Sequence, residues 1–191
     1  MAAVRDVTPR STLDVLAEAV RLKRLARAGW VRVGVKDGET VAAHSWGVAW
    51  LVLALCPPEL NRHRALAYAV VHDLAEVRTG DFTPHDAIPN KAELEEAAFR
   101  GLTDGLGRPD LANLFTSYEA QEDDEGRFVR QCDRLDMAVQ ALVYAAEGHP
   151  TDEFVRSAAA VIKHPALVPV LDALQTRMRE QITARTPSTR P

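Results

Sequence analysis

The stretch ALAYAVVHDLAEVRTGD, residues 65–81, joins a continuous apolar run to a cluster of acidic side chains. A helix that is apolar on nearly every face, as residues 65–71 are, is a buried helix. His72 and Asp73 follow directly, and Glu76 comes about one helical turn later. Burying a bare carboxylate is strongly unfavourable, so Asp73 must be paired or bound to a cation. The stretch therefore predicts a buried helix that carries a metal site.

The composition predicts a single all-α domain. The chain has 191 residues, of which 47% are apolar, 26% charged and only 6% aromatic. This length suits one domain, and alanine- and leucine-rich sequences of this kind favour helix over sheet. We expect a single-domain helical bundle over residues 11–185, with an N-terminal tail at 1–10 and a C-terminal tail at 186–191.

Apolar residues at helical spacing, capping residues and glycine or proline breaks define the expected elements. The expected helices cover residues 11–27, 41–55, 61–78, 91–106, 110–120, 123–147, 151–162 and 165–185. Residues 30–39 are expected to be irregular because they contain turn signals at Gly34 and at Asp37-Gly38. The loop DFTPHDAIPN, residues 81–90, is too long for a simple turn and is expected to pass over a functional region.

The charge and the termini exclude several classes of partner. A net charge of -4 and a pI of about 5.9 argue against a nucleic-acid-binding surface. They leave room for a small anionic ligand held by a few arginines. The longest apolar run, residues 48–56, is too short to span a bilayer. The N-terminal sequence MAAVRDVTPRST has no apolar leader, and Cys56 and Cys132 lie outside any CxxC pair. These features predict a cytoplasmic protein with buried thiols and no membrane partner.

Three expected helices supply candidate metal ligands. His44 alone would be read as a core histidine, since its neighbours at helical spacing are Val41, Val48 and Leu51. His72 and Asp73 change that interpretation, because side chains of this length converge on one ion lodged against the helix. Glu76 projects from the same side, where a carboxylate can take a proton from a metal-activated water.

A mononuclear site needs one more protein ligand, and the helix at 123–147 offers it. Asp133 lies inside the apolar stripe of FVRQCDRLDMAVQALVY and is the expected ligand. Asp136 lies one turn further along the same side, and we expect it to form a salt bridge or to support a ligand from behind.

The arrangement H…HD…D on three helices resembles the HD-domain superfamily of metal-dependent phosphohydrolases. The stretches LKRLARAGWVRVGV, ETVAAHSW, VVHDLAEVRTGD and FVRQCDRLD occur in the order and spacing of its 5′-deoxynucleotidase branch, over about residues 13–147. The resemblance implies an all-α bundle that is often a homodimer, with one divalent ion such as cobalt or manganese. It also implies a phosphomonoesterase that converts (deoxy)nucleoside 5′-monophosphates to nucleoside and phosphate.

The resemblance also implies roles for individual residues. It assigns the metal to His44, His72, Asp73 and Asp133, water activation to Glu76, a position near the scissile bond to Asp81, and substrate contact to Arg27 and Trp30. Two imidazoles with two carboxylates suit Mn, Co, Fe, Ni or Zn, and Mg is a further candidate. Arg27 would act as a bidentate phosphate clamp. Taken alone, Arg27 would be a solvated surface residue and Trp30 a core or lid residue.

Two positions depart from the pattern that the resemblance implies. Ala43 replaces the acidic residue that usually precedes the first histidine, and Gly47 replaces a larger residue. A glycine inside a helix costs up to about 1 kcal/mol. We expect Gly47 to widen the pocket, which would fit a specialised substrate such as a nucleotide intermediate of secondary metabolism.

Three other functions use the same scaffold. A di-iron oxygenase needs additional histidines between the HD pair and Asp133, where only His85 lies. A hydrolase of nucleoside triphosphates or pyrophosphorylated nucleotides needs more cations, for which Lys23, Arg24, Arg32 and Arg78 are the candidates. A non-catalytic metal module has no need of Glu76 and Asp81.

Overall fold

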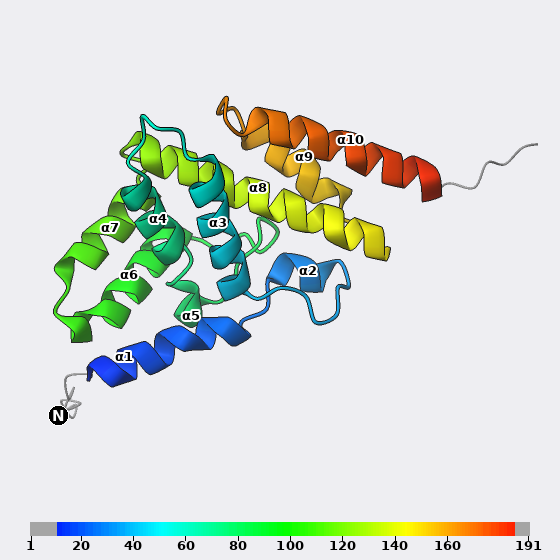
Figure 1. Ribbon diagram of the computed structural model, residues 1–191. Helices are drawn as coiled ribbons and strands as arrows, with labels where there is room; N and C mark the ends of the chain where they lie inside the picture. The colour runs from blue at the N-terminus through cyan, green and yellow to red at the C-terminus, as the bar shows by residue number, and fades with distance from the viewer. Residues whose placement is uncertain (1–10, 186–191) are drawn as a thin grey trace, which may run out of the picture.

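Helices and turns make up the computed structural model, which describes residues 11–185 (Figure 1). Over this range there is no strand, so the predicted all-α class is confirmed. The expected tails lie outside the described residues. The elements are α1 Thr12–Ala19, η1 Val20–Arg24, α2 Ala28–Arg32, α3 Val41–Leu55, α4 Arg62–Val71, α5 Glu76–Thr79, α6 Lys91–Thr103, η2 Asp104–Leu106, α7 Pro109–Glu119, α8 Asp124–Glu147, α9 Asp152–Val161 and α10 Val168–Arg185.

Helix α8 is the centre of the main core. It contacts α3, α4, α9 and α10, and Figure 1 shows it running between the α3–α4 pair and the α9–α10 pair. Its inward side is fully buried at Phe128, Val129, Cys132, Leu135, Ala138 and Ala141. Asp123 caps the helix by accepting a hydrogen bond from the Gly126 amide. A long apolar helix of this kind fixes the position of any polar side chain that it also carries.

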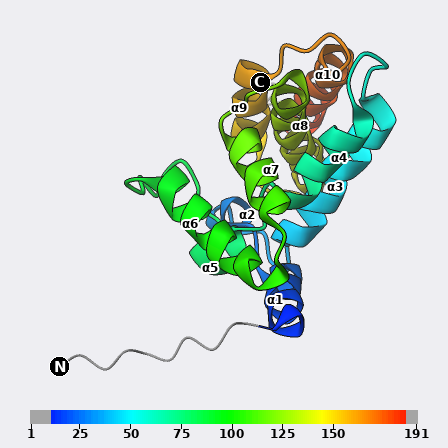
Figure 2. The ribbon, with the colours of Figure 1, turned by 90° about the vertical axis from the view of Figure 1, so that its left-hand side faces the viewer.

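A second, smaller core lies beside the first. Val71, Ala75, Ala98, Phe99 and Phe115 form it, and the rings of Phe99 and Phe115 stack with centroids 4.3 Å apart. Helix α6 contacts α5, α7 and α1, and Figure 2 shows it on the side of the molecule away from α9 and α10. The end of α4 therefore belongs to both cores.

The helix expected over residues 61–78 is broken in the structure. Helix α4 ends at Val71, a turn covers residues 72–75, and α5 begins at Glu76. The His72 amide still bonds four residues back to Tyr68, but the amides of Leu74 and Glu76 bond only three residues back, to Val71 and Asp73. Tighter bonding of this kind is common where a helix carries a functional site. Apolar periodicity did not reveal the break, because the turn keeps a near-helical course.

The segment between η1 and α3 also differs from the expectation. The helix expected over residues 11–27 is divided: α1 ends at Ala19 and η1 at Arg24, and Gly29 lies inside the short helix α2. Ala26 and Thr40 form an isolated antiparallel bridge: the Arg27 amide donates to the Glu39 carbonyl, and the Val41 amide to that of Leu25. This bridge places Arg27 and Glu39 beside the start of α3.

Candidate metal centre

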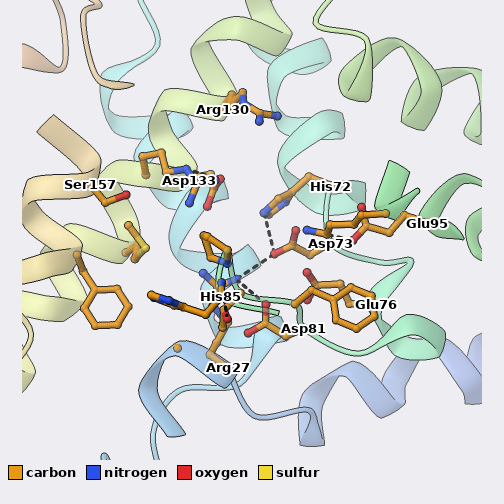
Figure 3. Close-up of a pocket in the computed structure, with 18 of the residues that line it drawn as sticks. Arg27, His72, Asp73, Glu76, Asp81, His85, Glu95, Arg130, Asp133 and Ser157 are labelled. Atoms are coloured by element: carbon orange, nitrogen blue, oxygen red, sulfur yellow. Dashed lines mark hydrogen bonds and ion pairs between the residues drawn. The ribbon is translucent and has the colours of Figure 1, made fainter. Parts of the chain in front are cut away.

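Four predicted ligands converge where α3, the end of α4 and α8 meet. Figure 3 labels His72, Asp73 and Asp133 among them. The Nε2 atoms of His44 and His72 are 3.4 Å apart. Asp133 Oδ1 lies 3.1 Å from His44 Nε2, and Asp73 Oδ2 lies 3.1 Å from His72 Nε2 and 3.6 Å from His44 Nε2. Ligands about 2.1 Å from a common ion are roughly 3.0–3.4 Å from one another. His44, His72 and Asp133 therefore fit a single divalent ion, and Asp73 borders the two imidazoles from outside the group whose ligand atoms all lie within 4.8 Å of one another.

The hydrogen bonds of the two histidines define which nitrogens face the centre. The His72 Nδ1 atom lies 2.9 Å from the Ala69 carbonyl, and the His44 Nδ1 atom lies 2.7 Å from Asp136 Oδ2. Both partners are acceptors, so both Nδ1 atoms carry the proton. The two Nε2 atoms then present lone pairs to each other and to two carboxylates. Such a group of acceptors requires a positive charge at its centre.

The pKa shifts of His44 and Asp73 in the metal-free site also indicate that a positive charge is needed at its centre. Burial opposes a charge on His44, as does Arg27, but the contacts with Asp133 and Asp136 outweigh both and raise its pKa to about 9. Burial also opposes the charged form of Asp73, yet His72, His44 and Arg27 hold its pKa well below the usual range. In the absence of a metal, a proton on His44 supplies the missing charge.

Glu76 lies beside this group as a buried, incompletely paired carboxyl group. The residue is only 5% exposed, and its Oε2 atom has no hydrogen-bond partner among the described residues. Burial, and then the charges of Asp73 and Asp81, raise its pKa to about 10. A cation near Asp73 would lower that pKa, because a bound ion is the largest charge in such a site. The structure places Glu76 where the sequence predicted it, next to the ligands.

Arg27 and Asp81 form the side of the site nearest α2. The guanidinium of Arg27 is mostly buried, with Nη1 3.3 Å from Asp73 Oδ2 and 3.9 Å from Asp81 Oδ1. The other oxygen of Asp81 accepts a hydrogen bond from the Ala28 amide at 2.6 Å. Asp81 therefore also fixes the backbone that carries Arg27. The structure brings both residues to the site, and the solvated position that Arg27 alone would predict is not observed.

Trp30 is mainly a core residue with one edge at the site. It is 2% exposed, and its ring packs against Tyr144 and Phe154 with centroid distances of 5.2 and 4.4 Å. Its indole N–H donates to Glu39 Oε1 at 2.8 Å. That hydrogen bond leaves only the carbon surface of the ring available to a ligand. Its predicted contact with substrate is therefore restricted to stacking or packing.

A cavity of about 500 Å³ opens over the ligands. The predicted loop at residues 81–90 contributes Phe82, Thr83, Pro84 and His85 to its wall, in agreement with its expected position over a functional region. Gly47, expected to widen the pocket, is not among the lining residues. Sequence reasoning missed several polar lining residues: Lys91, Glu95, Tyr118, Arg130 and Arg134. For Arg130 the available signal was its helical spacing, three residues before Asp133, whereas Arg134 directly follows Asp133.

The described residues contain two groups of side chains that could hold a metal ion. Over residues 11–185, the groups of histidine and carboxylate atoms close enough to share an ion are His44–His72–Asp133 and Glu39–His44–Asp136. His85, which a di-iron site would need, belongs to neither group. The cysteines Cys56 and Cys132 are buried and free, as expected.

The chain is similar to proteins of one family along most of its length. The family described as the HD domain matches residues 19–174. The 5'-deoxynucleotidase HDDC2 of Homo sapiens is 34% identical over 197 residues, covering 96% of this chain and 97% of the human protein. The 5'-deoxynucleotidase hdd1 of Schizosaccharomyces pombe is 30% identical, covering 93% of this chain and 94% of the yeast protein.

The fold is also similar to that of solved structures. A conserved hypothetical protein from Pyrococcus furiosus superimposes with a TM-score of 0.76 at 29% identity, covering 86% of this chain and 99% of that chain. No helix in the described part of the present chain has the length and apolar character needed to cross a membrane.

The position of Glu76 predicts an unusual pH dependence of stability. The pKa of Glu76 is higher in the folded protein, at about 10, than its ordinary value of 4.5. The free energy of unfolding of the metal-free protein should therefore fall as the pH rises from about 4.5 towards 10. We expect Glu76→Gln to remove this loss of stability. After EDTA treatment, the Glu76→Gln protein should melt several degrees above the parent at pH 8, at roughly 2–4 °C for each kcal/mol of stability. At pH 5 the difference between the two proteins should be much smaller. Equal differences at both pH values would contradict the assignment.

Proposed function

This chain belongs to the HD domain family, and we propose that it is a metal-dependent phosphomonoesterase that hydrolyses (deoxy)nucleoside 5′-monophosphates. The observation that carries the proposal is the convergence of two imidazole lone pairs and two carboxylates under a cavity that also contains Arg27 and Glu76. The relatives named 5'-deoxynucleotidase, matched over nearly the whole chain, support the same reaction and substrate class.

The donor set supports one ion held by His44, His72, Asp73 and Asp133. Imidazole nitrogen with carboxylate oxygen favours Mn, Co, Fe, Ni or Zn over Mg. When bound, such an ion would polarise a phosphate oxygen and stabilise the charge that develops on the phosphoryl group.

Glu76 and Arg27 would complete the reaction. The unpaired oxygen of Glu76 can accept a proton from the attacking water, as a general base must. Arg27 can turn its guanidinium from Asp73 to the phosphate, and its planar fork matches two phosphate oxygens. Trp30 would supply packing surface for the nucleoside at the edge of the cavity.

The distribution of cations favours a monophosphate over a polyphosphate. Of the four cations considered for a longer phosphate chain, Lys23, Arg24 and Arg78 do not line the cavity. The fourth, Arg32, lines it but forms an ion pair with Glu153. Lys91, also in the wall, lies 3.3 Å from Glu95. Arg134 lies 3.8 Å from Asp133, so among the described residues Arg130 is the one further lining cation without an ion pair. The cavity therefore offers few free cations to a longer phosphate chain.

The outer face of α3 supports a homodimer. Trp46, Trp50 and Leu53 are 71%, 56% and 49% exposed, and with Ala43 they follow the 3-4-3 spacing of a helix-packing seam. Helix α3 contains no Asp, Glu, Lys or Arg. An uncharged apolar helix face of this extent is typical of an interface between copies of one chain.

The area of this face agrees with that partner. Taking about 200 Å² for a whole indole, the two tryptophans expose roughly 250 Å². Val139 and Val143 of α8, on the helix side that carries Asp136 towards α3, are 38% and 47% exposed. Two such faces together bury roughly 1,000 Å², the size at which specific interfaces begin.

A cytoplasmic location of the protein stays a prediction.

The substrate class is tested by a phosphate-release screen. Ribo- and deoxynucleoside 5′-monophosphates should release inorganic phosphate in the presence of Mn, Co, Ni, Zn or Mg, whereas triphosphates should release little. His72→Ala, which removes one imidazole ligand, serves as the blank and should lose nearly all turnover. Phosphate release from triphosphates alone, or equal release by His72→Ala, would refute the proposal.

Asp81→Asn separates chemistry from scaffolding. The amide oxygen of asparagine can still accept the Ala28 N–H, so the fold around Arg27 should persist, while the charge near the reacting group is lost. We propose that Asp81, near the scissile bond, transfers a proton to the leaving group, so we expect an unchanged melting temperature and a kcat lower by about 100-fold. Full activity in this variant would restrict Asp81 to a structural role.

The dimer is tested by light scattering after size exclusion. The parent should show twice the chain mass of 21.0 kDa, and Trp50→Glu should show the single mass because it places a charge in the seam. Leu13→Glu is the matched control, since Leu13 is 74% exposed on α1, away from this face. A monomeric parent, or a Trp50→Glu protein that stays dimeric, would overturn the proposed interface.

A further inference from the structure

We propose that Gly47 and Asp136 act as a positioning pair for His44: the absent side chain of Gly47 leaves the space from which the Asp136 carboxylate orients the imidazole. The inference rests on the proposed metal site but not on the identity of the substrate. It concerns residues behind the ligands, none of which lines the cavity.

Asp136 holds His44 from the side opposite the metal centre. His44 is fully buried on α3, and its Nδ1 atom lies 2.7 Å from Asp136 Oδ2 on α8. A carboxylate in that position fixes the tautomer and the plane of the ring, and it makes the opposite nitrogen a stronger ligand. Because Asp136 comes one turn after Asp133 on α8, the same helix supplies one ligand and the support of another.

The approach of this carboxylate to α3 requires a glycine. Gly47 lies three residues after His44, on the same face of α3. A Cβ atom at residue 47 would lie 2.1 Å from Asp136 Oδ1 and 2.8 Å from its Cγ. Even an alanine is therefore incompatible with the observed position of Asp136. The pair accounts for a glycine in the interior of α3, where this residue weakens a helix.

The surroundings limit where a displaced carboxylate could go. A carboxylate oxygen of Glu39 lies within 4.8 Å of both a ring nitrogen of His44 and an Asp136 oxygen. Glu39 is itself fixed, because the Trp30 indole donates to its side chain and its own amide donates to the Tyr144 hydroxyl. A second acidic group thus borders the same space. Adding one methyl group at residue 47 should therefore remove the support of His44 rather than shift it slightly.

A double-mutant cycle tests the pair. Co²⁺ is titrated into EDTA-treated parent, Gly47→Ala, Asp136→Ala and the double variant by calorimetry, and the visible absorption of bound Co²⁺ reports its ligand geometry. Each single variant should bind Co²⁺ about 10- to 100-fold more weakly, with an altered spectrum. The double variant should bind no more weakly than Asp136→Ala, because the methyl group then meets no carboxylate.

Thermal unfolding of the same metal-free proteins gives a second readout. Gly47→Ala should lower the melting temperature of the parent but raise that of Asp136→Ala by roughly 2 °C, since alanine is the better helix former once the clash is gone. Gly101→Ala is the matched control in α6, where the added Cβ would meet only the flexible end of Arg78. It should leave Co²⁺ affinity unchanged.

Several results would overturn the pair. These are parent-like Co²⁺ affinity in Gly47→Ala or Asp136→Ala, full additivity of the two substitutions, or an equal loss in Gly101→Ala. If Gly47→Ala does not fold, recovery of folding in the double variant supports the pair, and failure of both contradicts it. The Co²⁺ titrations use no substrate. If the four proteins show the expected Co²⁺ affinities but the parent releases no phosphate from nucleotides, the proposed function is refuted and the Gly47–Asp136 pair is still supported.

Discussion

The mutual approach of four hydrogen-bond acceptors is the constraint on which the rest of the site depends. The two imidazole nitrogens lie 3.4 Å apart and each has a carboxylate oxygen at 3.1 Å, and such acceptors repel one another unless a cation lies among them. The helices can hold these atoms together because α8 is packed on several sides and α3 and α4 pack against it. The packing energy of the hydrophobic core thus offsets the repulsion among these acceptors. In the metal-free protein, a proton on His44 reduces that repulsion.

The sequence identified the chemistry of the site better than its local backbone. His44, His72, Asp73 and Asp133 meet as expected, because polar residues in apolar helical stripes have few positions open to them. The break after Val71 was not predicted, since the turn at residues 72–75 differs from an α-helix only in that some of its amides bond three residues back instead of four. Helix α2 was missed because its glycine resembled a helix end. Long, periodic elements such as α8 were predicted with their ends nearly correct.

Residues contributed by distant elements were the hardest to predict. Lys91 and Tyr118 line the cavity from α6 and α7, and no local pattern linked them to the HD pair. Gly47 was expected to act on the pocket, whereas its neighbour is a carboxylate on α8. A glycine's role depends on what comes close to its α-carbon, and that is a property of tertiary packing. A single sequence without its fold does not contain that information in readable form.

The Ala26–Thr40 bridge has a consequence for the motion of the site. One backbone hydrogen bond of the bridge joins the residue that would clamp phosphate, Arg27, to the residue that lies behind the metal ligands, Glu39, and a second joins Val41 to Leu25. Short pairings outside regular elements open at lower free energy than core helices. One local opening would therefore separate the backbones of Arg27 and Glu39, while their side chains stay held by Asp73 and Trp30. The bridge thus ties the backbone on the phosphate side of the site to the backbone behind His44.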